Sequence, residues 1–144
     1  TDRDEARFAQ ASRQMLETSN YIDIRFQDKP RYKKPIGIYW LQAACAGLTV
    51  GTRPAIWAYR LPSFSGALLA VLLTFYFGAS FFNRKAGFLA AILLESCLLL
   101  NVEAHIATTD AMLLAMVVAM QGFLGRVYLQ RRAGVSPGMG NALL

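Results

Sequence analysis

Charged residues are scarce in this sequence, and so are the residues that usually build metal and thiol sites. Of its 144 residues, 17% are charged, whereas a soluble domain typically has about 25%. Two cysteines exclude a small disulfide-stabilised scaffold, and the single histidine needs other ligands before it can hold a metal. The sequence also contains no CxxC, HExxH, P-loop or nucleophile-elbow motif. Any chemistry therefore has to come from the few charged side chains.

Apolar residues are abundant, and they indicate where the protein resides. Hydrophobic residues make up 55% of the chain, which is too much for a disordered protein. The net charge of +6 suits nucleic-acid binding, but eight of the fifteen Lys and Arg residues fall within residues 1–35. We therefore predict a membrane protein with no nucleic-acid partner. Because the chain starts at Thr1 and ends in the apolar run Ala142 to Leu144, we expect a fragment of a larger polytopic protein.

Three long apolar stretches are candidates for membrane spans, each of which needs about 20 residues. Residues 61–83 carry no charge, and residues 86–102 carry only Glu95. Residues 111–125 are uncharged, and Arg126 can extend its side chain from a helix end towards water. The sequence thus predicts an all-α fold with transmembrane helices over 61–83, 86–103 and 110–129. A basic turn at residues 83–85 joins the first two, and residues 130–144 form a cytoplasmic loop.

The first 60 residues are more polar and predict juxtamembrane structure. Apolar residues recur at helical spacing between Glu5 and Glu17, which predicts a short amphipathic helix within a polar loop over 1–35. Tyr21 to Phe26 is typical of extended chain. Residues 36–51 are short for a span, so we expect a helix lying flat at the interface, followed by a loop to residue 60. The aromatic residues around this segment suit the headgroup region: Tyr39, Trp40, Trp57 and Tyr59.

The orientation of residues 36–51 decides which acids can meet. If this segment lies flat, two spans separate Asp4 from Asp110, and both face the same compartment. The opposite face then carries the basic residues Arg84, Lys85, Arg126, Arg131 and Arg132, as expected for a cytoplasmic side. If the segment spans the membrane instead, the two acids lie on opposite sides. We favour the flat arrangement.

Several side chains are candidates for function, and each has a plainer alternative. Asp4 and Asp110 begin helices and could serve only as caps, but two carboxylates at one membrane face are more often functional or paired. Lys34, with Lys33 and two other cations nearby, could attract anionic lipid or bind a lipid-linked phosphate. Glu95 is expected to lie buried in the middle of its span, as a relay or a polar contact. His105 lies near Asp110 and is a candidate ligand for phosphate or metal.

Several short runs resemble one family of membrane enzymes. They are Asp4-Glu5-Ala6-Arg7-Phe8, Met15-Leu16-Glu17, Lys34-Pro35 leading into Tyr39-Trp40, Arg60-Leu61-Pro62-Ser63, Asn83-Arg84-Lys85-Ala86-Gly87 and Ile106-Ala107-Thr108-Thr109-Asp110. In order and spacing they resemble bacterial lipid-linked-sugar glycosyltransferases of the GT-C fold. The likeness is greatest to the 4-amino-4-deoxy-L-arabinose lipid A transferases and the wider protein O-mannosyltransferase-like superfamily. It covers nearly the whole chain.

The resemblance implies roles for particular residues. Asp4 matches the essential acid of the first periplasmic loop, and Asp110 matches the second acid. Lys34 and Arg7 match cations near the donor phosphate, and we assign Glu5, Lys33 and His105 to substrate binding beside them. His105 stands where many relatives have Arg, and Phe8 where Tyr is common. The resemblance also implies an active site that faces the periplasm from a bacterial inner membrane.

The chemistry implied is transfer of a sugar from a polyprenyl-phosphate donor to an acceptor on lipid A, a glycan or a protein. We expect an inverting reaction with Asp4 as the base and Asp110 supporting it, because one carboxylate opposite the leaving group is the geometry of inversion. No cofactor is required by this scheme, and a divalent metal ion between the two acids is left open. The competing hypotheses are a non-catalytic protein whose basic loop binds anionic lipid, and a transporter segment that uses Glu95.

Overall fold

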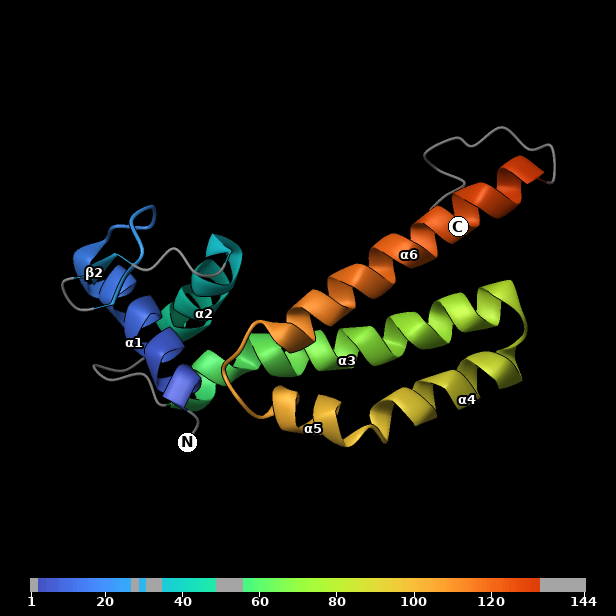
Figure 1. Ribbon diagram of the computed structural model, residues 1–144, viewed down its shortest axis with the longest axis horizontal. Helices are drawn as coiled ribbons and strands as arrows, with labels where there is room; N and C mark the ends of the chain where they lie inside the picture. Colours follow the sequence, from blue (N-terminus) through green and yellow to red (C-terminus); the bar gives the residue numbers. More distant parts are fainter. Residues whose placement is uncertain (1–2, 27–28, 31–34, 49–55, 133–144) are drawn as a thin grey trace.

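The computed structural model describes residues 3–26, 29–30, 35–48 and 56–132. Its helices are α1 (Arg3–Thr18), α2 (Ile36–Leu48), α3 (Ile56–Phe81), α4 (Arg84–Glu95), α5 (Leu98–Ala104) and α6 (Asp110–Arg132). Helices α1 and α2 gather at one end of the molecule, and the other helices extend from them as a long bundle (Figure 1). The predicted all-α fold is confirmed. A short antiparallel ladder, β1 (Arg25–Phe26) with β2 (Lys29–Pro30), accompanies α1.

Helix α1 forms where the amphipathic pattern predicted it, and its apolar face is buried. Phe8, Ala11 and Met15 are each at most 3% exposed, at spacings that place them on one side of a helix. The helix ends where Ser19 adopts a left-handed backbone with a φ of 53°. Asn20 then accepts hydrogen bonds from the backbone N–H groups of Ile22 and Asp23, which makes a turn. Extended chain is therefore confirmed only at β1, the last two residues of the predicted stretch.

Helix α2 packs on α1, and each helix contributes one aromatic ring to the contact. The rings of Phe8 and Tyr39 stack with centroids 5.4 Å apart. Tyr39 has no exposed surface and Tyr59 is 3% exposed, whereas Trp40 and Trp57 are about half exposed. The expectation that all four aromatics lie among lipid headgroups is thus wrong for the two tyrosines, because they fill the contacts between helices.

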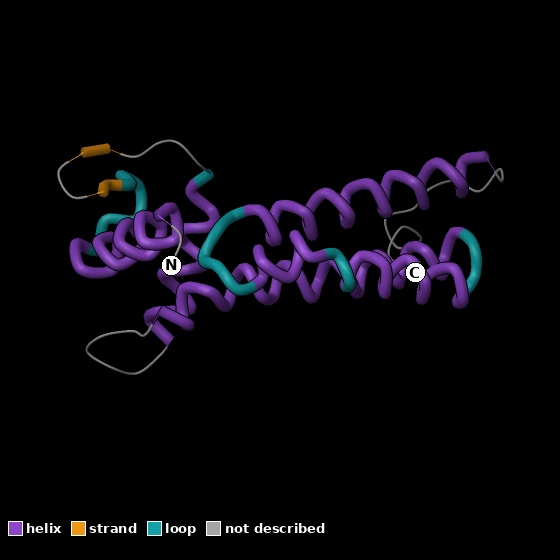
Figure 2. The backbone as a smooth tube through the Cα atoms, turned by 60° about the horizontal axis from the view of Figure 1, so that its bottom comes forward, coloured by secondary structure: helices purple, strands orange, loops and turns teal. Residues whose placement is uncertain are grey.

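Helix α3 is the central element, and it begins earlier than predicted. It starts at Ile56 rather than residue 61, so the end of the loop expected between residue 51 and residue 60 is helical. Pro62 lies in its second turn without ending it. Helices α2, α4, α5 and α6 all contact α3 (Figure 2). Residues that were expected in a loop, including Arg60, are therefore positioned by the longest helix of the structure.

The predicted span over 86–103 is not one straight helix. Helices α4 and α5 are separated at Ser96 and Cys97, and their axes differ by 66°. The side-chain amide of Asn101 donates to the carbonyl oxygens of Glu95, at 2.6 Å, and Cys97, at 3.2 Å. Such side-chain bonds replace backbone bonds of a continuous helix and stabilise the break. Glu95 lies exposed at the end of α4, so the expectation that it is buried in mid-span is wrong.

Helix α6 covers the segment predicted as a span, 110–129, and continues to Arg132. Small residues allow it to approach α3 closely, since a Cβ atom added to Gly66 would lie 2.6 Å from the Met112 backbone. Within the described residues, α3 and α6 are long and apolar enough to cross a membrane, and the bent pair α4–α5 could count as a third span. The protein is therefore a multi-pass membrane protein.

The close approach of α3 and α6 predicts that Gly66→Ala destabilises the protein. The added methyl group overlaps backbone atoms of Met112, which cannot rotate away, so we expect a loss of about 1–3 kcal/mol. Thermal unfolding of the full-length protein in detergent measures this loss. Gly37→Ala is the matched control, because a Cβ atom at Gly37 in α2 meets nothing within 4 Å. Equal melting temperatures for both variants would contradict the proposed close contact.

Candidate functional site

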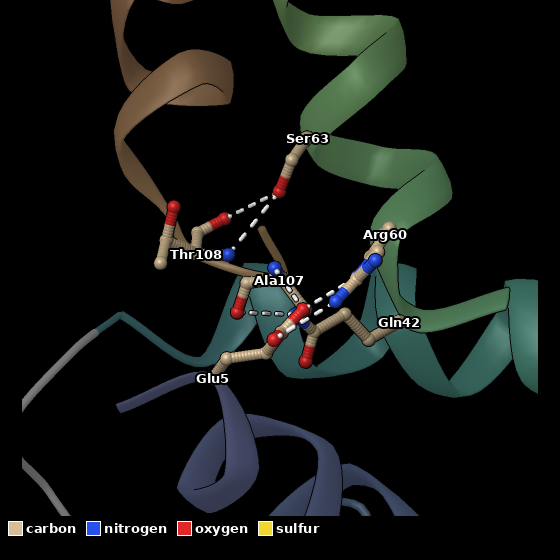
Figure 3. Close-up of polar contacts among 6 residues, drawn as sticks. All are labelled: Glu5, Gln42, Arg60, Ser63, Ala107 and Thr108. Atoms are coloured by element: carbon tan, nitrogen blue, oxygen red, sulfur yellow. Dashed lines mark hydrogen bonds and ion pairs between the residues drawn. The ribbon is translucent and has the colours of Figure 1, made fainter. Parts of the chain in front are cut away.

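The polar contacts of the structure gather where four segments meet. The loop between α5 and α6, residues 105–109, returns to the starts of α1 and α3 and to the side of α2 (Figure 3). Six residues from these segments form the polar junction: Glu5, Gln42, Arg60, Ser63, Ala107 and Thr108. The segments are brought together from positions as much as 102 residues apart in the sequence. This junction is the candidate functional site.

Glu5 is the centre of the polar junction, and its side chain has no exposed surface. Arg60 holds it with both ends of the guanidinium fork, Nε to Oε1 at 2.6 Å and Nη2 to Oε2 at 3.1 Å. The backbone N–H of Ala107 donates to the same Oε1 at 3.2 Å. One carboxylate thus joins the first turns of α1 and α3 to the loop that precedes α6.

The surroundings of Glu5 keep it ionised. Burial alone raises the pKa of the Glu5 carboxyl, because it disfavours the charged form. The hydrogen bond from Arg60, the N–H of Ala107 and the positive charge of Arg60 outweigh burial, so the net pKa lies below the ordinary value of 4.5. Glu5 is therefore a buried anion that is matched to a cation.

Gln42 provides a second connection from α2. Its amide Nε2 donates to the carbonyl oxygen of Ala107 at 3.4 Å, and its Oε1 accepts from the hydroxyl of Ser12 at 2.8 Å. Gln42 and Ser12 have no exposed surface. Both backbone polar groups of Ala107 are thus bound by side chains, one from α1 and one from α2. The position of the 105–109 loop is fixed from two sides.

The residue after Ala107 is bound in the same way by α3. The Ser63 hydroxyl donates to the carbonyl oxygen of Thr108 at 2.9 Å and lies 3.2 Å from its N–H. The Thr108 hydroxyl donates to Oε2 of Glu103 at 2.6 Å. Thr109 and Asp110 follow directly, so these contacts also determine where α6 starts.

The structure brings the backbones of the two predicted acids to the same junction. Asp4 precedes the buried Glu5 in α1, and Asp110 lies three residues after Ala107, to which Glu5 bonds. The Asp110 side chain is exposed at the start of α6, whereas the side chain of Asp4 lies outside the described part. This contact brings the segments that carry Asp4 and Asp110 together, while the placement of both acids on one side of a membrane stays a prediction.

Of the other predicted site residues, only Glu5 belongs to the polar junction. Arg7 is half-buried in α1, and His105 is exposed at the end of α5, where its Nδ1 lies 2.7 Å from the Asn101 carbonyl oxygen. Lys33 and Lys34 lie outside the described residues. The assignment of Glu5 to substrate binding stays a prediction, and the contacts seen here are internal. Among the residues described, no three His, Cys, Asp or Glu side chains gather as a metal site would require.

Of the six residues of the polar junction, only Glu5 was predicted as a site residue; sequence analysis missed Gln42, Arg60, Ser63, Ala107 and Thr108. Arg60, Ser63, Ala107 and Thr108 appeared only within runs that resemble a family, and Gln42 was not singled out. An arginine at the end of an uncharged stretch can extend its side chain towards water, so the position of Arg60 gave no signal that it has a buried partner. The identity of its partner, 55 positions away, is visible only in the fold.

We predict that Arg60→Ala destabilises the protein more than Glu5→Gln does. The first change leaves a buried carboxylate without its cation, and such losses reach about 3–5 kcal/mol when both partners are buried. We expect less here, because the Arg60 side chain is 37% exposed. Thermal unfolding measures both variants. Arg13→Ala is the control, since it breaks an Arg–Glu pair that is more than half exposed and should change little.

The lowered pKa of Glu5 predicts a specific pH dependence. A carboxyl whose pKa is lower in the folded state stabilises the fold above its unfolded pKa, and that contribution is lost as pH falls through the folded pKa. The melting temperature of the wild type should therefore fall towards that of Glu5→Gln as the pH drops below about 4.5. A difference between the two proteins that stays constant from pH 7 to pH 3 would contradict this assignment.

Comparisons with known proteins agree with the fold and show the family of the chain. Residues 33–142 match the family described as dolichyl-phosphate-mannose-protein mannosyltransferase. Two similar proteins are undecaprenyl phosphate-alpha-4-amino-4-deoxy-L-arabinose arabinosyl transferases. The protein from Erwinia tasmaniensis is 30% identical over 83% of this chain and 22% of its own length. The protein from Aeromonas hydrophila subsp. hydrophila is 30% identical over 91% of this chain and 23% of its own length.

A solved structure supports the same fold. The crystal structure of ArnT from Cupriavidus metallidurans in the apo state superimposes with a TM-score of 0.76 at 22% identity. The match covers 83% of this chain and 22% of that one. The chain thus spans less than a quarter of the length of the relatives it matches. The family match covers most of its residues, and the chain belongs to the dolichyl-phosphate-mannose-protein mannosyltransferase family, whose members include glycosyltransferases of the GT-C fold.

Proposed function

We propose that this chain is part of a membrane glycosyltransferase that transfers a sugar from a polyprenyl-phosphate donor. The acceptor would be a hydroxyl or phosphate group on lipid A, a glycan or a protein. Family membership supports the general reaction, and the names of two relatives, undecaprenyl phosphate-alpha-4-amino-4-deoxy-L-arabinose arabinosyl transferases, support this class of donor. We place the reaction at the periplasmic face of a bacterial inner membrane.

The observation that carries this proposal is the bond between Glu5 and Ala107. It ties the first turn of α1 to the loop before α6, and the residues beside these two points are Asp4 and Asp110. Because Glu5 is buried and paired with Arg60, the connection lies inside the protein rather than on its surface. A site with two acids from distant segments suits a reaction that has to position an acceptor against a bound donor.

The chemistry assigns different tasks to the acids and the cations. The bond between the anomeric carbon and the donor phosphate oxygen breaks, and the phosphate leaves as an anion without needing a proton. An acceptor hydroxyl forms the new bond to the anomeric carbon from the opposite face, and its proton passes to a carboxylate. We assign Asp4 as this base and Asp110 as the acid that orients the acceptor or supports Asp4.

The departing phosphate needs positive charge nearby. We assign Arg7, Lys34 and Lys33 to this role, with Arg suited to bidentate contact and Lys acting as a point charge. His105, at the start of the 105–109 loop, would bind substrate beside Asp110. A divalent ion held by Asp4 and Asp110 stays a hypothesis, since hard cations prefer six or more oxygen ligands.

We predict that Asp4→Asn and Asp110→Asn in the full-length enzyme abolish sugar transfer and leave its amount in the membrane unchanged. The amide cannot take up the proton of the acceptor hydroxyl, while its size stays close to that of the carboxylate. Transfer of labelled sugar from a polyprenyl-phosphate donor is the assay, and Asp23→Asn, the same change in the turn after α1, is the control. Retained activity in Asp4→Asn would reject the assignment. A silent Asp110→Asn together with dispensable lysines would favour a lipid-binding loop instead.

A further inference from the structure

A second polar surface lies at the opposite end of α3 from the polar junction. Arg60 and Ser80 are 20 positions apart in this helix, which corresponds to about 30 Å, the thickness of a bilayer core. At the far end, α3, α4 and α6 form a groove of about 530 Å³. The groove is lined by Phe75, Tyr76, Ala79, Ser80, Arg84 and Arg126. We call it the arginine groove.

The two arginines of this groove have no acidic neighbour in the lining. From residue 56 to residue 132, the sequence has only three acids, Glu95, Glu103 and Asp110. Glu103 and Asp110 belong to the end of the bundle that holds the polar junction. Glu95 ends α4, eleven residues or about 16 Å along the helix from Arg84. The positive charge of the arginine groove is therefore not compensated by the acids of this part of the chain.

One of the arginines is held in place. Arg126 Nη1 donates to the Tyr76 hydroxyl at 2.6 Å, and the guanidinium carbon lies 5.4 Å from the centre of the tyrosine ring. Arg84 is the first residue of α4, where the helix dipole adds partial positive charge. The cap at Asn83, whose side chain accepts from the Ala86 N–H at 2.9 Å, fixes this helix start. Arg131 and Arg132, by contrast, are exposed at the end of α6.

We propose that the arginine groove binds an anionic phospholipid of the membrane leaflet opposite the polar junction. The lipid phosphate would lie between Arg84 and Arg126 and accept from the Ser80 hydroxyl, while an acyl chain lies against Phe75. The groove combines cationic donors at the membrane surface with an apolar wall that leads towards the bilayer core, and phospholipids have this combination of chemistry. The proposal does not depend on the reaction at the polar junction.

Native mass spectrometry of the full-length protein, delipidated and titrated with phosphatidylglycerol or phosphatidylcholine, tests this site. We expect one retained phosphatidylglycerol and no matching retention of phosphatidylcholine. Replacing both Arg84 and Arg126 with Gln should weaken retention by about fivefold per arginine. The matched control replaces Arg131 and Arg132 with Gln, which removes the same charge outside the groove, and should leave the single lipid bound.

Two outcomes would overturn the proposal. Equal weakening in both double variants would mean diffuse attraction to the basic end of the bundle, and no weakening in either would mean that another segment covers the groove. Ser80→Asp gives an independent test if the arginine variants fail to fold. It adds a negative charge at an exposed lining position and should abolish retention of phosphatidylglycerol, whereas Ser80→Ala should lower it only slightly.

Discussion

A buried carboxylate is the constraint on which the rest of the described structure depends. Burying an ionised Glu5 away from solvent costs several kcal/mol unless a cation and hydrogen-bond donors compensate for the lost hydration. The compensating groups come from the first turns of α3 and from the loop before α6. Helix α1 can therefore bury its Phe8 and Met15 face only in an arrangement that also delivers Arg60 and Ala107 to Glu5.

Close packing along α3 complements this polar constraint. Gly66 allows α6 to cross near the polar junction, and Gly87 of α4 approaches the backbone of α3 at Ala79, where an added Cβ atom would lie at 2.5 Å. Glycines at such crossings let one helix contact several others without large side chains between them. The polar junction and the arginine groove are thus connected by a helix that is held along its length. Their relative positions at the two ends of α3 follow from that packing.

Hydropathy and periodicity predicted much of the fold but not its irregular points. The apolar face of α1 and the uncharged run of α6 specify their own helices, because the information is local. The charge of Arg60 ended the uncharged run at residue 61, so the residues before it were predicted to be a loop. In the structure this charge is neutralised by an acid 55 positions away, and the helix begins before it. The break after Glu95 is stabilised by hydrogen bonds from Asn101. A mean hydropathy taken over the segment does not detect them. Likewise, the hydrogen bond from the Ala107 N–H to Glu5 joins residues 102 positions apart, and no local pattern predicts it.

The break between α4 and α5 has a consequence for the lipid around the protein. Helix α4 has 12 residues and is about 18 Å long, and α5, turned by 66°, adds little height along the same direction. Helix α3, with 26 residues, is about 39 Å long. Neighbouring faces of one bundle thus present very different apolar heights. A bilayer in contact with both would meet a hydrophobic mismatch beside α4 and α5, which local thinning would relieve, on the side where Glu95, Asn101 and His105 line a hollow of about 170 Å³.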